Sequence, residues 1–204
     1  MRKGLIWPLL AVPLLALMPA ARAAALQRVR GAIESVAPDH IIVQDRTGAR
    51  VNVHLSDPLT VLIVTPLDGS GVRVGRAAAV VVKQARDGSL VAVQVLALPD
   101  SLVDGRDGGE IWDLRPDNRM LVGEIASTGR RNGTAELTIS GREGTKVVAL
   151  PADTPVALVQ MAARSDLKVG EAVVLVGFIS PDGSVSADRV VVSPKATADP
   201  TPSG

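Results

Sequence analysis

Two histidines, His40 and His54, are the side chains of this sequence best suited to bind a metal ion. They flank a predicted hairpin whose loop, Asp-Arg-Thr-Gly at 45–48, is typical of a three-residue turn with a left-handed glycine. This loop pairs Val43 with Val51, and the same register sets His40 opposite His54 on the outer face. Two imidazoles placed in this way could form half of a site for Zn, Cu or Ni.

The rest of such a metal site is harder to find in the sequence. Asp39 and Asp57 lie near the same strand ends, but no third ligand is evident from the pattern. In the second half of the chain, Glu136 and Leu150 occupy the matching places, so the predicted hairpin does not require histidines. A solvated surface pair of histidines is therefore the alternative to a metal site.

Acidic residues gather between Asp104 and Glu110. A calcium loop alternates oxygen ligands at its positions 1, 3 and 5 and has glycine at position 6. Arg106 occurs where the second of these ligands belongs. The pattern therefore favours a solvated linker over a calcium site.

No arrangement of residues typical of catalysis is found. Neither histidine belongs to a motif such as G-x-S-x-G, and the glycine-serine-glycine stretch at 69–71 lacks the lysine and helix of a phosphate-binding loop. The absence of cysteine excludes disulfides, thiolate metal sites and a cysteine nucleophile. We expect a protein that is not an enzyme and needs no cofactor.

The first 23 residues have the layout of a secretory signal peptide. Arg2 and Lys3 precede an apolar run from Leu5 to Leu17, and Ala-Arg-Ala at 21–23 is a small-x-small cleavage site. The run is about 13 residues long, shorter than the roughly 20 that a spanning helix needs. We expect cleavage before Ala24 and no stable membrane insertion afterwards, with an uncleaved anchor as the alternative.

Charge and aromatic content argue against nucleic acid as a partner. The whole chain has 22 Lys and Arg against 21 Asp and Glu, and removal of Arg2, Lys3 and Arg22 leaves 19 against 21, a net charge of −2. The mature chain has only Trp112 and Phe178 as aromatic residues. Single-stranded nucleic acid is bound through basic grooves and stacked aromatics, which this composition does not supply.

The elements that would position these residues recur along the chain. Leu-Lys-Val-Gly at 167–170, an apolar run and Pro-Asp-Gly-Ser at 181–184 match Val-Arg-Val-Gly at 72–75 and Arg-Asp-Gly-Ser at 86–89. The offset is 95 residues without a gap, which indicates one unit used twice. We expect a signal peptide (1–23), a first unit (27–98), a linker with a docked apolar segment (99–119), a second unit (120–192) and a disordered tail (193–204).

Each unit alternates apolar and polar residues in a way that predicts five strands. The connection between the third and fourth strands is one helical turn or an extra short strand at 61–64 in the first unit. In the second unit, residues 159–167 contain no glycine or proline and predict a short helix. Three strands, a connection and a two-strand hairpin are the strand order of an OB-type barrel. The predicted fold is all-β, with two tandem OB-like five-stranded barrels; two small open β-sandwiches, or one larger sandwich, are the alternative.

The repeated segments resemble a family of small exported bacterial domains of unknown function. The resemblance lies in Leu167–Glu171, Pro181–Gly183 and Ala187–Val190, and it covers both units, the second more closely. The first unit departs from it at Arg76, where the family usually has an acidic residue. The resemblance implies export and an OB-like fold, and it implies no particular chemistry.

Three large apolar residues stand out in the linker, namely Ile111, Trp112 and Leu114. Each unit has only about 70 residues, a size at which burial of apolar surface is marginal. We expect these side chains to pack against a barrel wall and fix the two units relative to each other. The alternative is a surface patch that awaits a partner.

These observations predict a non-catalytic envelope protein, periplasmic or secreted. We expect a protein-binding or structural adaptor module whose partner is an envelope protein. The alternative is a periplasmic protein that binds a small ligand or a divalent metal, with His40 and His54 as candidate ligands.

Overall fold

The computed structural model describes residues 26–68, 71–102, 117–180 and 183–193, and within them the fold is all-β. The first five strands are β1 (Leu26–Val36), β2 (His40–Asp45), β3 (Arg50–Leu67), β4 (Ala77–Gln84) and β5 (Leu90–Ala97). The next six are β6 (Asn118–Arg131), β7 (Thr134–Gly141), β8 (Gly144–Leu150), β9 (Val156–Ala162), β10 (Ala172–Ile179) and β11 (Val185–Ser193). Two single 3-10 turns are also present, η2 (Asp100–Leu102) and η3 (Arg164–Asp166).

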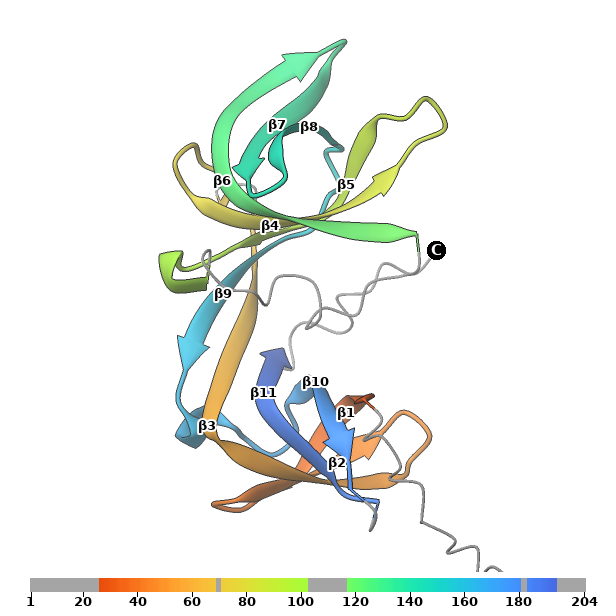
Figure 1. The fold of residues 1–204 in the computed structure, drawn as a ribbon, viewed down its shortest axis with the longest axis vertical. Helices are drawn as coiled ribbons and strands as arrows, with labels where there is room; N and C mark the ends of the chain where they lie inside the picture. Colours follow the sequence, from red (N-terminus) through yellow and green to blue (C-terminus); the bar gives the residue numbers. More distant parts are fainter. Residues whose placement is uncertain (1–25, 69–70, 103–116, 181–182, 194–204) are drawn as a thin grey trace, which may run out of the picture.

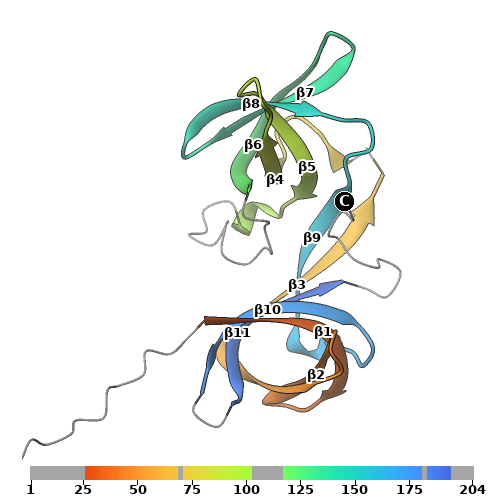
Figure 2. The same cartoon turned by 90° about the vertical axis from the view of Figure 1, so that its right-hand side faces the viewer.

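Five of these strands close into a barrel, seen at the bottom of Figure 1 and end-on in Figure 2. β1 pairs with β2 and β10, β2 pairs with β3, and β10 pairs with β11, all antiparallel. The parallel pairing of β11 with β3 completes the ring. Alternate residues of each strand point inward, so the barrel is filled by aliphatic side chains such as Ile33, Ile41, Val53, Leu175 and Val190, each at most 1% exposed.

The closed barrel combines strands from both of the sequence units. β1, β2 and β3 come from residues 27–98 apart from Leu26, whereas β10 and β11 come from the second half of the chain. The hairpin of β4 and β5, which follows β3 in the sequence, pairs elsewhere.

The further strands form a second ring of pairings at the top of Figure 1. β4 pairs with β5 and β6, β6 pairs with β7, and β7 pairs with β8, all antiparallel. β5 meets β8 in parallel at two positions, Leu90 with Val148 and Val91 with Ala149. The interior of this ring contains Val80, Val95, Ile125, Leu137 and Val148. This ring also combines both sequence units, because β4 and β5 precede the linker and β6 to β8 follow it, apart from Asn118 and Arg119 at the start of β6.

The second half of β3 and the whole of β9 run side by side between the two rings. Their antiparallel register extends from Val61 opposite Ala162 to Leu67 opposite Val156. β11 runs parallel beside β3, and β5 runs parallel beside the start of β9. One continuous sheet therefore connects the two rings.

A third apolar core lies in this bridging region. Its buried members are Leu62, Val64, Ala77, Ala79, Leu96, Leu98, Ala157, Val159 and Val191, and the side chains of Leu102, Met120 and Val122 pack against it. β4 contributes to this core and to the interior of the second ring, so its residues Ala77–Val82 are all buried. A strand covered on both faces has no solvent-facing side, so its sequence is a continuous run of apolar residues.

The two connections in which the sequence allowed helical turns, at 61–64 and 159–167, are mainly extended. Residues 61–64, for which a helical turn or a short strand was expected, continue β3 as a strand. The short helix predicted at 159–167 is wrong: the chain is extended through Ala162 and makes only the single turn η3. The backbone of Gln160 and Met161 pairs with Ile63 and Leu62, and this ladder replaces the hydrogen bonds that a helix would have made.

The glycines of two predicted hairpin turns have the left-handed conformation expected from the sequence. Gly48 and Gly88 have φ angles of 86° and 85°, a conformation that glycine adopts without a steric penalty. The predicted signal peptide and nearly all of the predicted tail and apolar linker segment lie outside the described residues. Ser193, assigned to the tail, is the last residue of β11. Among the described residues no helix has the length and hydropathy to cross a membrane.

Candidate functional site

The two histidines are paired as the sequence predicts. His40 lies opposite His54 across β2 and β3, and Ile41 with Val53 and Val43 with Val51 confirm the register. Ile41, Val43 and Val53 are fully buried, so the alternate positions, which carry the histidines, must lie on the outer face. The side chain of His40 is 40% exposed, and the pair is accessible to solvent.

Asp39 adds a carboxylate beside the histidine pair. His40 Nδ1 donates a hydrogen bond to Asp39 Oδ1 at 2.8 Å. This bond, more than the weaker attraction of the histidine charges, holds the pKa of Asp39 below its usual value of 3.8. An ionised carboxylate and two imidazoles are chemically suitable ligands for a divalent transition metal.

A residue of the other sequence unit holds this corner of the barrel in place. The Arg164 guanidinium donates to the carbonyl oxygen of Pro38 at 2.6 Å and to that of Ser56 at 3.2 Å. The backbone N–H of Leu55 donates to the Asp39 carbonyl at 2.8 Å. The backbone on both sides of the histidine pair is therefore fixed by long-range contacts.

The histidine pair remains a half-site. Within the described residues, no three His, Asp or Glu side chains are grouped closely enough to hold a metal ion. Glu136 and Leu150, which the sequence matched to the two histidines, are not a cross-strand pair. Glu136 lies opposite Ala149. The turn between β7 and β8 has only two residues beyond the paired Gly141 and Gly144, one fewer than the turn after β2, which shifts the register by one.

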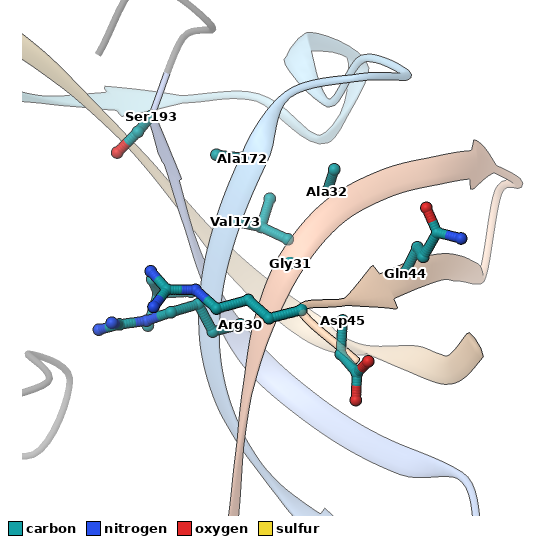
Figure 3. A pocket seen from close by; sticks show the side chains of 10 residues that line it. Arg30, Gly31, Ala32, Gln44, Asp45, Ala172, Val173 and Ser193 are labelled. Atoms are coloured by element: carbon teal, nitrogen blue, oxygen red, sulfur yellow. The ribbon is translucent and has the colours of Figure 1, made fainter. Parts of the chain in front are cut away.

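A hollow of about 310 Å³ lies on the same barrel, where β1, β2, β10 and β11 come together. Figure 3 shows the small side chains of Ala32, Ala172 and Val173 between the hydroxyl of Ser193 and the polar groups of Gln44 and Asp45. Arg30 and Arg46 complete the polar part of the lining. A polar rim above small apolar side chains is a composition found in small-molecule sites.

The polar groups around this hollow already serve the fold. Asp45 Oδ1 accepts hydrogen bonds from the hydroxyl and the backbone N–H of Thr47 and from the backbone N–H of Ala49. The bond from the Thr47 hydroxyl is the main cause that lowers the pKa of Asp45. Both Arg30 and Arg46 interact with other groups of the chain. A ligand here would meet groups that are positioned in advance.

The predicted packing residues Ile111, Trp112 and Leu114 lie outside the described residues. Within the described part, the core between the rings is built from β3, β4, β5, β9 and β11, a contribution that sequence reasoning missed. The signal for it was present in Ala77–Val82, six consecutive apolar residues where a half-exposed strand would alternate.

Comparison with known proteins gives no match to this chain: no family model fits it, and no curated protein or solved structure is similar to it. A function for this chain is therefore inferred from the geometry of the described residues.

Proposed function

We propose that this chain is a non-catalytic exported protein of the cell envelope that acts as a protein-binding or structural adaptor. In this proposal the two rings are tandem OB-like barrels that have exchanged their C-terminal hairpins. The observation that carries it is the origin of the strands: each ring contains strands from both halves of the chain. Neither ring can turn independently, because a common sheet and a buried core join them. Such a body is suited to presenting binding surfaces at a fixed separation.

The open edge of β8 is the surface we assign to a protein partner. Residues 144–147 pair with β7 on one side, whereas β5 reaches only Val148 and Ala149 on the other. Val147 is 53% exposed on this edge. An unpaired strand edge with an exposed apolar side chain can accept an added strand from another protein.

The adaptor function is tested in the cell with a photo-crosslinking amino acid in place of Val147. The matched control carries the same amino acid at Val148, which is fully buried. We expect the Val147 variant to give a discrete adduct with an envelope protein, and the control to give none. Equal adduct patterns, or none above background at either position, would contradict this role.

N-terminal sequencing of the same purified protein tests export. The sequence should begin near Ala24, and an intact Met1 would argue against cleavage.

A second candidate function is the binding of a small ligand or divalent metal. The pairing of His40 with His54 beside the Asp39 carboxylate favours it. If this function is correct, Zn²⁺ or Cu²⁺ raises the melting temperature of the protein and His40→Ala removes the increase. Asp87→Asn, which changes a carboxylate in a distant turn, is the control that should leave the increase intact. A metal effect that survives His40→Ala would exclude the histidine site.

A further inference from the structure

We propose that the second ring contains a binding site for a small amphipathic carboxylate, in a hollow of about 490 Å³ at one of its ends. The hollow lies between the turn that joins β6 to β7 and the connection from β8 to β9. Its described lining consists of Val72, Arg130, Gly133, Thr134, Ala135, Leu150, Pro151, Ala152, Thr154 and Val156. This inference is independent of the adaptor role and of the histidine pair.

The corresponding end of the closed barrel is filled. With the offset of 95 residues, Val72 corresponds to Leu167, which is 4% exposed and belongs to the barrel core. Thr154 corresponds to Leu59, which packs against the same core. The second ring thus has a smaller side chain than the first at two positions that face this end. Missing side-chain volume that the surroundings do not replace leaves a cavity.

The arginine that fastens the cap of the closed barrel has no counterpart in the sequence of the first unit. Arg164 in η3 fastens that cap by donating to the carbonyl oxygens of Pro38 and Ser56. The residue at the corresponding place in the first unit is Gly69, which has no side chain to make such bonds. The two units therefore differ in sequence at the position of this arginine.

Apolar side chains at equivalent positions are less deeply buried at this end of the second ring than at the filled end of the closed barrel. Leu55 and Val61 at the closed end are 2% and 1% exposed. Their counterparts in the second ring are Leu150, which is only partly buried, and Val156, which is 9% exposed. The apolar walls of the hollow are thus more accessible than those of the filled end.

One polar group in the hollow has an unused hydrogen-bonding capacity. Thr154 Oγ1 is buried, and among the described residues no group hydrogen bonds to it. A buried hydroxyl without a partner costs free energy that a bound ligand can recover. Thr154 replaces an apolar residue of the other unit, so the hydroxyl is specific to the open end.

The lining indicates the chemical class of the ligand. Val72, Leu150 and Val156 offer aliphatic walls, and Arg130 is the one charged residue in the described lining. The guanidinium favours an anionic head group, ideally a carboxylate that accepts two hydrogen bonds. The volume lies within the range of sites for small molecules. An aliphatic chain with a terminal carboxylate matches all three features.

The test is a titration of the full mature chain with octanoate, below its micelle-forming concentration, followed by amide NMR shifts and calorimetry. We expect saturable binding with the largest shifts at Val72 and Thr154. Thr154→Leu, which installs the residue of the filled end, should weaken octanoate binding at least tenfold. Val72→Leu provides a second filling variant and should have the same effect if Thr154→Leu does not fold.

Charge recognition is tested separately with Arg130→Gln. This variant should weaken binding of octanoate several-fold and leave the binding of 1-octanol unchanged. Arg131→Gln is the matched control, because Arg131 lies beside Glu136 and is not part of the described lining. The proposal is overturned if octanoate does not bind saturably, or if it binds equally well to both filling variants.

Discussion

Val64 and Val159 are paired with each other across β3 and β9, and they lie 95 positions apart, the offset that relates the two halves of the sequence. A residue that pairs with its own counterpart marks a local two-fold axis. Other pairings obey the same relation: Val190 pairs with Val61 as Val95 pairs with Val156. If the two halves are copies of one unit, as we propose, they meet as two like molecules would meet in a symmetric dimer.

The proposed exchange of hairpins has an energetic consequence. Each ring buries apolar side chains from both halves of the chain, and the core around Leu62, Leu96 and Val191 is shared. Burial of a large aliphatic side chain contributes on the order of 2 kcal/mol. Because no half retains a complete core, we expect the two rings to unfold together.

The hydrogen bond between His40 and Asp39 leads to a prediction about pH. Since this bond stabilises the ionised carboxylate, the pKa of Asp39 in the folded protein lies below 3.8. A depressed pKa contributes stability above the unfolded value, and this contribution is lost as the pH falls through the folded pKa. His40→Ala should raise the pKa of Asp39 toward 3.8, as measured by NMR of the side-chain carboxyl carbon.

Asp87 is an internal control for this titration. Its pKa is lowered mainly by a hydrogen bond from the Ser89 hydroxyl, far along the chain from His40. The pKa of Asp87 should stay low in His40→Ala. An unchanged Asp39 midpoint in that variant would show that the imidazole does not set it.

Gly31 is required by the close approach of β1 to β2. A Cβ atom at this position would lie 2.0 Å from the backbone oxygen of Gln44, which cannot move without breaking the sheet. We expect Gly31→Ala to lower the free energy of unfolding by about 2–3 kcal/mol, as overpacking typically does. Urea denaturation measures the change.

Gly129 provides the matched control for this substitution. It also lies in a strand, β6, but an added Cβ atom would meet no other atom within 4 Å. Gly129→Ala should change stability by less than about 0.5 kcal/mol. Similar losses for both variants would contradict a steric requirement specific to Gly31.

The local structure of the closed barrel was predictable because it depends on short-range signals. Paired valines at 43 and 51 and a left-handed Gly48 determine the hairpin, and with it the placement of His40 opposite His54. These features are local in the chain, so the alternation of apolar residues was sufficient to define them.

The pairing of strands from different halves of the chain could not be predicted from the same signals. The β4–β5 hairpin and the β10–β11 hairpin are alike in sequence, so either would offer β1 a suitable apolar face. The choice depends on whether the chain turns back after residue 59 or continues as a strand toward the second ring, as β3 does. The helix expected at 159–167 failed for the same reason, because its partner strand lies about 95 residues away in the sequence.

Trp112 belongs to the apolar segment of the linker, which lies outside the described residues. Once the leader with Trp7 is removed, Trp112 is the single tryptophan, so its fluorescence is unambiguous. We expect blue-shifted emission protected from quenchers, because its large apolar surface gains from burial. Trp112→Ala should then lower the free energy of unfolding by about 2–3 kcal/mol. Emission like that of indole in water would show that Trp112 is a surface residue.

The exchange of hairpins is tested most directly by engineered disulfides, because the chain contains no cysteine of its own. Arg28 pairs with Val176 across β1 and β10, at a separation that a disulfide can bridge. If each half kept its own hairpin, Arg28 would instead pair with Val81, the counterpart of Val176.

Two variants, Arg28→Cys with Val176→Cys and Arg28→Cys with Val81→Cys, are oxidised and their disulfides mapped by mass spectrometry of unreduced peptides. If the hairpins are exchanged, we expect an efficient intramolecular disulfide between positions 28 and 176 in a monomer, and none between 28 and 81. A disulfide between 28 and 81 without one between 28 and 176 would contradict the exchange.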